Sequence, residues 1–223
     1  TVFDVDCQSS ADSFYREHGI AVQLRTEVTR VDCGRKRLLL RTGEEVGYDQ
    51  LVIATGARVR TLGGGPDVLY LRSMGDSKRI RAAAESAKRA VVIGSGFIGM
   101  EVAAVLAQKG VDTTMVLRED RIWKSFFTPE MSSFFERYYS DRGVRFAKQT
   151  SVSEFSRDRV QLANGQSVAC DIVVAGVGVE PVTEVLAGSG INVDNGVTVN
   201  EYLETNQPGV YAAGDVANYM DVI

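Results

Sequence analysis

The sequence has little cysteine, no basic excess and no long apolar run, and each shortage excludes a class of protein. Its three cysteines, Cys7, Cys33 and Cys170, lie far apart and form no C-x-x-C pair. Neither a disulfide framework nor a zinc site is therefore indicated. Buried or incidental thiols are the ordinary interpretation, and they favour a reducing compartment such as the cytoplasm or an organelle matrix.

Charge and hydropathy exclude two further classes. The net charge is −4 and the pI is near 5.2, whereas a surface for nucleic acid or anionic membrane normally carries a basic excess. No apolar run approaches the roughly 20 residues of a membrane span. With 223 residues, 44% of them hydrophobic and 24% charged, the chain has the size of one large or two small globular domains.

What the sequence does contain is a continuous strand–turn–helix–strand pattern at residues 90–120. Residues 91–93 are an apolar, β-branched run, typical of a strand that is buried on both faces. Gly94, Gly96 and Gly99 follow in G-x-G-x-x-G spacing.

A helix is predicted after these glycines, because apolar residues recur at helical period. Gly110 is predicted to end this helix as its C′ residue, and residues 113–117 form a second β-branched strand. The recurring apolar residues of the helix are Ile98, Val102, Val105 and Leu106. These segments together make one βαβ unit.

Each of the three glycines has a distinct structural role in such a unit. Gly94 lets the chain turn, Gly96 lets main-chain N–H groups approach a pyrophosphate, and Gly99 lets the helix pack closely on the strand. The positive end of the helix dipole adds to the attraction for an anion. The pattern therefore predicts a dinucleotide site, and the alternative is a βαβ crossover with no ligand.

Short strands and helices are predicted over the rest of the chain. Thr128 and Pro129 mark the start of one helix, whose aromatic stripe of Phe134, Phe135, Tyr138 and Tyr139 is expected in the core. The basic outer face of the helix at 77–88 is expected in solvent. The predicted helices are at residues 10–18, 77–88 and 129–141 and from Val216 onward. The predicted strands are at residues 20–24, 28–31, 36–41, 46–48, 51–53, 144–147, 151–155, 159–162, 167–169, 171–175, 197–199 and 210–213.

Three motifs fit together along the chain. Ala54-Thr55-Gly56 follows an apolar strand, the glycine fingerprint lies in the middle, and Tyr211-Ala212-Ala213-Gly214-Asp215 follows a late strand. On these motifs the sequence resembles the FAD-dependent pyridine-nucleotide oxidoreductases that have two dinucleotide-binding domains. The sequence looks most like the branch of monodehydroascorbate reductases and apoptosis-inducing-factor-like proteins, with the ferredoxin and rubredoxin reductases close by. Residues 115–119, 126–128 and 138–144 are especially similar to monodehydroascorbate reductases.

The resemblance implies an α/β fold in which a Rossmann-like NAD(P)-binding domain is inserted into an FAD-binding domain of the same general type. Residues 1–62 and 185–223 would belong to the FAD domain, and residues 63–184 to the NAD(P) domain. The implied reaction passes hydride from NADH or NADPH to FAD, and then electrons to a small-molecule or small redox-protein acceptor. The cofactors carry that chemistry, so no catalytic side chain is named. A homodimer is one candidate for the oligomeric state.

For FAD, the resemblance implies a role for residues near two strand ends. Asp215, after Gly214, would accept a hydrogen bond from the ribityl chain, which suits a carboxylate; the alternative is an ordinary turn aspartate. Ala54-Thr55-Gly56 would cross between the domains near FAD, with Arg58 close by, or would form a plain strand-end turn. Val28 would contact the adenine through its backbone.

For the nicotinamide cofactor, the resemblance implies a larger set of residues. Glu101 would help to place the nicotinamide, or would simply be a favourable carboxylate in a first helical turn. Val177 and Gly178, in the loop that starts at Gly176, would approach the nicotinamide. The fingerprint itself contributes Gly94, Ser95, Gly96, Phe97, Ile98 and Gly99.

The preference between NADH and NADPH depends on the residues after the second strand of the βαβ unit. An acidic residue there holds the ribose 2′-hydroxyl of NADH, and an arginine accepts the 2′-phosphate of NADPH. Leu117 takes the usual acidic place, and Arg118 and Lys124 favour NADPH. Glu119 matches a glutamate of monodehydroascorbate reductases and favours NADH, which is the slightly preferred prediction.

Two features of the family are not found in these 223 residues: a first strand with its own glycine fingerprint for FAD, and a final interface domain. We therefore expect a fragment that binds FAD weakly or not at all. The alternatives are a dinucleotide-binding module without turnover and an NADH-sensing flavoprotein of the apoptosis-inducing-factor type. A thiol–disulfide variant would need a cysteine pair, and the middle of the chain has only Cys170.

Overall fold

The computed structural model describes residues 13–63 and 67–219, and the chain divides into two compact units. The first unit comprises Thr1–Thr55 with Val182–Ile223, and the second comprises Gly56–Pro181. The assignment of FAD to the first and of NAD(P) to the second stays a prediction. Of the helix predicted at residues 10–18, residues 13–17 are helical; its proposed start and Cys7 lie outside the described residues.

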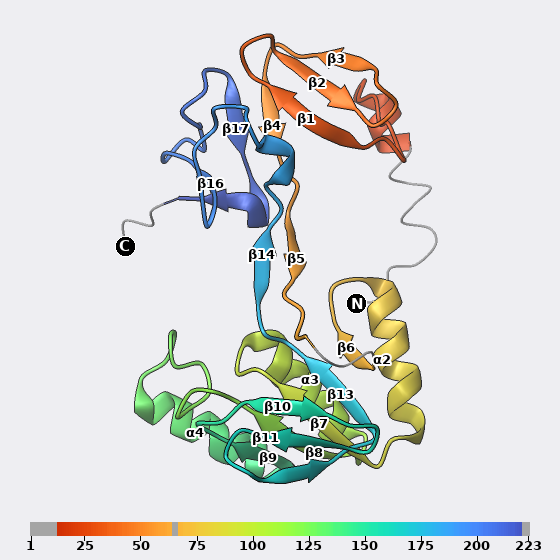
Figure 1. Cartoon of the computed structure of the whole chain (residues 1–223), viewed down its shortest axis with the longest axis vertical. Coiled ribbons are helices and arrows are strands. Elements are labelled where there is room, and N and C mark those ends of the chain that lie inside the picture. The colour runs from red at the N-terminus through yellow and green to blue at the C-terminus, as the bar shows by residue number, and fades with distance from the viewer. Residues whose placement is uncertain (1–12, 64–66, 220–223) are drawn as a thin grey trace. The chain divides into compact units, whose positions relative to one another are not determined.

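The Gly56–Pro181 unit is built on a five-stranded parallel sheet in the order β6-β13-β7-β8-β9 (Figure 1). This arrangement confirms the α/β fold class. The strands are β6 (Val68–Tyr70), β7 (Arg89–Ile93), β8 (Asp112–Val116), β9 (Val144–Ala147) and β13 (Ile172–Ala175). The helices are α2 (Met74–Ser86), α3 (Phe97–Gln108) and α4 (Pro129–Ser140). The antiparallel strands are β10 (Val152–Phe155), β11 (Arg159–Leu162) and β12 (Ser167–Ala169), and the pair β5 (Ala57–Val59) and β14 (Val179–Pro181).

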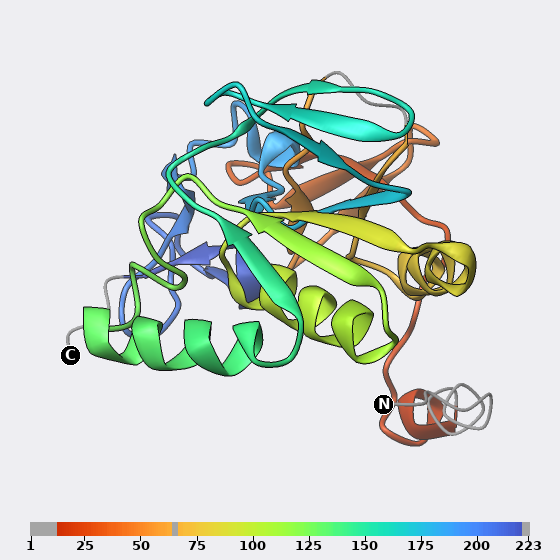
Figure 2. The same ribbon diagram turned by 90° about the horizontal axis from the view of Figure 1, so that it is seen from below.

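Apart from β5 and β14, these elements form three layers, with β10 to β12 on one face of the parallel sheet and the helices on the other (Figure 2). Alternation along β7 explains the layers, because successive side chains point to opposite faces. Ala90 and Val92 pack in the cluster with the helices, whereas Val91 and Ile93 pack in the cluster with β11. A strand covered on both faces needs apolar residues throughout, as the sequence predicts.

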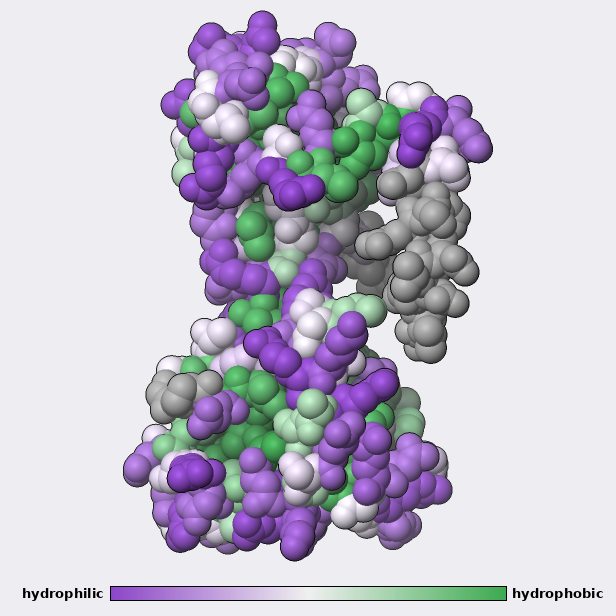
Figure 3. Space-filling model, turned by 90° about the vertical axis from the view of Figure 1, so that its right-hand side faces the viewer, coloured by the Kyte–Doolittle hydropathy of each residue, from purple (hydrophilic) through white to green (hydrophobic). Residues whose placement is uncertain are grey.

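The ends of the helices follow local chemistry. Ser73 caps α2 and forms a reciprocal capping box with Asp76, so α2 begins earlier than the predicted residue 77. Thr128 caps α4 with Pro129 at its first position, as predicted. Gly110 has φ +81° and follows the last turn of α3, as expected of a C′ glycine. The exposed cations of α2 confirm its solvated basic face, on the side shown in Figure 3.

The described residues of the other unit form three small sheets. β4 and β17 pair in parallel, β15, β16 and β18 form a second sheet, and β1, β2 and β3 form an antiparallel sheet. Its strands are β1 (Val28–Asp32), β2 (Arg37–Leu40), β3 (Glu45–Gly47), β4 (Leu51–Ile53), β15 (Val193–Asp194), β16 (Gly196–Thr198), β17 (Val210–Ala212) and β18 (Ala217–Asn218). The described part of this unit also contains the 3₁₀ turns η1 (Glu184–Leu186) and η2 (Gly214–Val216).

Several local predictions were wrong. Residues 20–24 are not a strand, and their apolar side chains are exposed. No helix begins at Val216; the chain instead continues from η2 into β18, which pairs with β16. Half of the aromatic stripe on α4 is outside the core, since Phe134 is 56% and Tyr138 45% exposed. In α3, Ile98 and Val105 are exposed, and the buried side consists of Gly99, Met100, Val102, Ala103 and Leu106.

Candidate functional site

A pocket of about 500 Å³ lies at the carboxyl ends of β7, β8 and β13. The chain leaves β7 for β8 on one side and returns as β13 on the other, so β7 and β13 form the switch point of the sheet. Ligands of open α/β sheets bind at that position. Its lining residues are Arg60, Thr61, Leu62, Gly63, Ile93, Gly94, Ser95, Gly96, Val116, Arg118, Glu119, Thr150, Ser151, Val152, Ser153, Phe155, Gly176, Val177 and Gly178.

The three fingerprint glycines occupy three different environments. Gly94 has φ +112°, and a Cβ added to it would lie 2.2 Å from the carbonyl oxygen of Gly176. A Cβ on Gly99 would lie 2.7 Å from the carbonyl oxygen of Gly94, so α3 packs directly on the turn. A Cβ on Gly96 would meet nothing within 4 Å. The backbone at Gly96 is therefore open to a ligand, whereas the other two glycines are required by packing.

The start of α3 suits an anion. Its N-cap residue is Gly96, which provides no side-chain cap for the first turn. The leading N–H groups of a helix have no partner within the helix, and they bind phosphate well when they face open space. The residues present thus fit the pyrophosphate of a dinucleotide.

Glu119 is joined to the fingerprint by a hydrogen bond. The hydroxyl of Ser95 donates to Oε2 of Glu119 over 2.9 Å, and both side chains are partly buried. Glu119 lines the pocket and is twenty residues beyond Gly99, the spacing at which an acidic residue holds the adenosine ribose in Rossmann-type domains.

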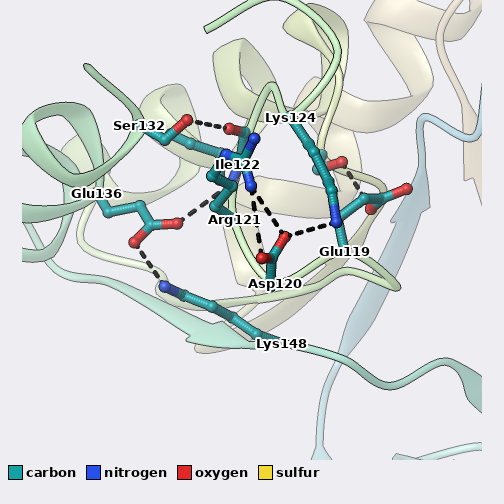
Figure 4. Close-up of polar contacts among 9 residues, drawn as sticks. Glu119, Asp120, Arg121, Ile122, Lys124, Ser132, Glu136 and Lys148 are labelled. Carbon is teal, nitrogen blue, oxygen red and sulfur yellow. Dashed lines mark hydrogen bonds and ion pairs between the residues drawn. The ribbon is translucent and has the colours of Figure 1, made fainter. Parts of the chain in front are cut away.

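The other residues predicted to select the cofactor lie in different places. Arg118 is exposed and lines the pocket. Leu117 is 1% exposed and packs in the core with the helices, so its side chain does not line the pocket. Lys124 forms an ion pair with Asp120 over 3.1 Å instead of entering the pocket (Figure 4).

The segment after Glu119 is fixed against α4. Oε1 of Glu136 accepts a hydrogen bond from the Ile122 N–H at 3.1 Å, and the buried Ser132 hydroxyl donates to the Ile122 carbonyl at 2.8 Å. Lys148 pairs with the other oxygen of Glu136 (Figure 4). These contacts fix the end of the β8 loop relative to the sheet.

The remaining nicotinamide candidates divide into two groups. Val177 and Gly178 line the pocket beside Gly176. Phe97, Ile98 and Glu101 are exposed on α3 and do not line it; the Phe97 ring stacks on Trp123 at 5.3 Å between centroids.

Sequence reasoning missed two parts of the pocket wall. Residues 60–63 lie there because the Arg60 N–H donates to the Gly178 carbonyl at 3.0 Å and the Leu62 N–H donates to the Tyr70 hydroxyl at 2.7 Å. Residues 150–153 lie there because Thr150 extends the β8–β9 pairing through the Leu117 carbonyl at 3.1 Å. No local pattern marks either segment, since only the packed sheet brings them to the pocket.

In the other unit, two of the predicted motifs lie side by side. β4 and β17 are parallel neighbours with Ile53 opposite Ala212, so Ala54-Thr55 and Gly214-Asp215 leave the same edge of this sheet. The Thr55 hydroxyl donates to the Val182 carbonyl at 2.6 Å, and Asp215 is exposed in η2.

Three further FAD candidates lie elsewhere. Val28 begins β1 and is half-buried. Arg58 is in β5 of the Gly56–Pro181 unit, where its guanidinium pairs with Glu180. Gly56 belongs to that unit as well.

The two cysteines within the described residues, Cys33 and Cys170, are free thiols. Burial raises the pKa of Cys170 and also that of Cys33, and it raises the pKa of Tyr48, the neighbour of Cys33, to about 12. Within residues 13–63 and 67–219, no cluster of histidine, cysteine, aspartate and glutamate could hold a metal ion. None of the helices in these ranges is long and apolar enough to cross a membrane.

The chain matches a known protein family and several of its curated members. The family model described as pyridine nucleotide-disulphide oxidoreductase matches residues 6–223. The peroxisomal monodehydroascorbate reductase 4 of Arabidopsis thaliana is 38% identical over 221 residues, which cover 92% of this chain and 45% of that protein. The chain thus spans about half the length of the curated relatives it matches.

Solved structures show the same similarity. The ferredoxin reductase for the CYP199A2 system of Rhodopseudomonas palustris matches with a TM-score of 0.89 and 35% identity, over 95% of this chain and 54% of that one. A putidaredoxin reductase, solved as a covalent complex with putidaredoxin, matches with a TM-score of 0.89 and 31% identity, over 94% of this chain and 54% of that one.

Proposed function

Because the chain belongs to the pyridine nucleotide-disulphide oxidoreductase family, we propose that its Gly56–Pro181 unit binds NADH and serves a flavin-dependent oxidoreductase. The observation that carries this proposal is the pocket at the β7–β13 switch point. Its wall includes both the open backbone of Gly96 and the carboxylate of Glu119. The first feature fits a pyrophosphate and the second fits a ribose diol.

Each part of the pocket has a proposed role. The amides at residues 95–97 and the dipole of α3 hold the pyrophosphate. Glu119 accepts hydrogen bonds from the adenosine ribose, and its negative charge opposes a 2′-phosphate, so NADH is preferred to NADPH. Arg118 lies exposed at the pocket wall and gives NADPH residual affinity. The loop of Gly176, Val177 and Gly178 lies beside the nicotinamide half.

FAD is the proposed partner cofactor, and it supplies the step from two-electron to one-electron transfer. Asp215 would hold its ribityl hydroxyls, with Thr55 at the neighbouring strand end; the adjacency of β4 and β17 supports this pairing. The sequence has one G-x-G-x-x-G, at residues 94–99, so these 223 residues are proposed to bind FAD weakly.

The acceptor is proposed to be a one-electron acceptor, either monodehydroascorbate or a small redox protein. The names of the relatives support these two choices, one being a monodehydroascorbate reductase and another a reductase bound to putidaredoxin. A location in the cytoplasm or in an organelle matrix is proposed as well, and it is compatible with the peroxisomal relative.

Reduction of a dye acceptor tests the oxidoreductase function. The chain, supplied with excess FAD, should reduce the dye with NADH, and more slowly with NADPH at equal concentration. A chain that binds NADH by titration but reduces nothing would instead be a dinucleotide-binding module without turnover. The single glycine fingerprint in these residues is the observation behind this second candidate.

A further inference from the structure

We infer that Ser95 is a positioning residue that orients Glu119 and thereby sets the preference for NADH over NADPH. This inference rests on the proposed function, because it concerns how the same pocket chooses its nucleotide. Its basis is the 2.9 Å hydrogen bond from the Ser95 hydroxyl to one carboxylate oxygen of Glu119. Ser95 would thus act through Glu119, and its hydroxyl would make no bond to the nucleotide.

The backbones of both residues are fixed before any ligand arrives. The Ser95 carbonyl accepts from the Trp123 N–H at 3.4 Å, and the Gly94 N–H donates to the Val116 carbonyl at 2.9 Å. The Glu119 carbonyl accepts from the Gln149 N–H at 3.1 Å. The serine hydroxyl therefore meets the carboxylate from a fixed position at the ends of two adjacent strands.

The bond leaves one oxygen of Glu119 for a ligand. Among the residues described by the structure, Ser95 is the only hydrogen-bond donor to this carboxylate. A carboxylate only accepts hydrogen bonds, so its second oxygen suits the 2′-hydroxyl of an adenosine ribose. A 2′-phosphate has no such donor at neutral pH and would face a fixed negative charge.

Orientation matters because a free glutamate side chain has many rotamers. Ordering it on binding reduces affinity, and a hydroxyl that already holds one oxygen removes part of that loss. Loss of the hydroxyl should therefore weaken NADH more than NADPH, since NADPH gains when the carboxylate can turn away. A residue with only a structural role would not change this ratio.

A double-mutant cycle measured by calorimetry tests the inference. The variants are Ser95→Ala, Glu119→Ala and the double variant, each titrated with NADH and NADPH. Ser95→Ala alone should weaken NADH binding about 5- to 10-fold, a loss that lies within the range for directly coupled residues. In the Glu119→Ala background, the same change should alter NADH binding by less than about 2-fold. Ser95→Thr keeps the hydroxyl and should restore most of the affinity.

Ser73→Ala is the matched control for stability. Ser73 caps α2 and does not line the pocket, so its loss should lower the melting temperature and leave the NADH to NADPH ratio unchanged. Ser95→Ala should show the opposite pattern, an unchanged melting temperature with a changed ratio.

The outcomes separate this inference from the proposed function. If the wild-type chain binds neither nucleotide, the proposed function fails and the inference fails with it. If the wild type binds NADH but Ser95→Ala weakens both nucleotides equally, or neither, then the positioning role is wrong and the proposed function stands. Additive effects of the two substitutions would also overturn the positioning role.

Discussion

The carbonyl oxygen of Gly176 lies where a side chain on Gly94 would have to be, only 2.2 Å from the ideal Cβ position. Gly94 follows β7 and Gly176 follows β13, so this contact closes the switch point of the parallel sheet. It gives the first glycine of the fingerprint a packing role that is separate from ligand binding.

Gly94→Ala should therefore destabilise the fold. The backbone at Gly94 has φ +112°, and strain together with overpacking should cost about 2–5 kcal/mol. Thermal unfolding followed by circular dichroism measures this loss. Gly96→Ala is the matched control, because its Cβ would meet nothing within 4 Å and its melting temperature should stay near that of the wild type. Equal melting temperatures for the two variants would contradict this assignment.

Glu119→Ala should shift the cofactor preference toward NADPH. Removing the carboxylate takes away a charge-assisted hydrogen bond to the ribose, which weakens NADH about 10-fold, and also removes repulsion of a 2′-phosphate. Nucleotide titrations give both dissociation constants. Asp120→Ala is the control, since Asp120 is paired with Lys124 and does not line the pocket. A similar shift in that control would refute the assignment to Glu119.

Asp171 should make the stability of the Gly56–Pro181 unit sensitive to acid. The guanidinium of Arg89 and the N–H groups of Lys88 and Arg89 lower the pKa of Asp171 to about 2, from an ordinary value of 3.8. Because the folded pKa is the lower one, the stabilisation is present above about pH 4 and disappears as the pH falls toward about 2.

Comparison of Asp171→Asn with the wild type checks this prediction. The variant should melt at a lower temperature near neutral pH, and the difference should shrink through the window between about pH 4 and pH 2. A difference that does not depend on pH would show that Asp171 acts without its charge.

The flavin content of the purified 223-residue chain should be far below one FAD per chain, since its one glycine fingerprint lies in the pocket proposed for NADH. The absorbance spectrum and the flavin released on denaturation measure this content. A yellow protein with near-stoichiometric flavin would show that Asp215 and its neighbours suffice for tight binding.

The βαβ unit could be predicted because its signals are local and contiguous. The apolar run of β7, the spacing of the glycines and the stop at Gly110 lie within 22 residues of one another, and the structure has the strand, turn and helix there. The start of α2 is also encoded locally, in the capping box of Ser73 and Asp76, whereas the predicted start at residue 77 is too late.

Other features depend on packing and could not be read from the sequence. The apolar alternation at residues 20–24 has no neighbouring strand, so it remains irregular and exposed. Phe134 and Phe135 have the same chemistry, yet only Phe135 faces the core with Trp123. Arg60 and Thr150 reach the pocket through long-range contacts that no local motif announces.

Calorimetric titration of the purified chain with NADH is the most direct test of the central claim, that the amides around Gly96 together with Glu119 hold a dinucleotide. We expect one site per chain, with weaker binding of NADPH and loss of most NADH affinity in a Gly96→Val variant that still folds. Absence of binding heat with either nucleotide at several temperatures, or undiminished NADH affinity in folded Gly96→Val, would contradict the account.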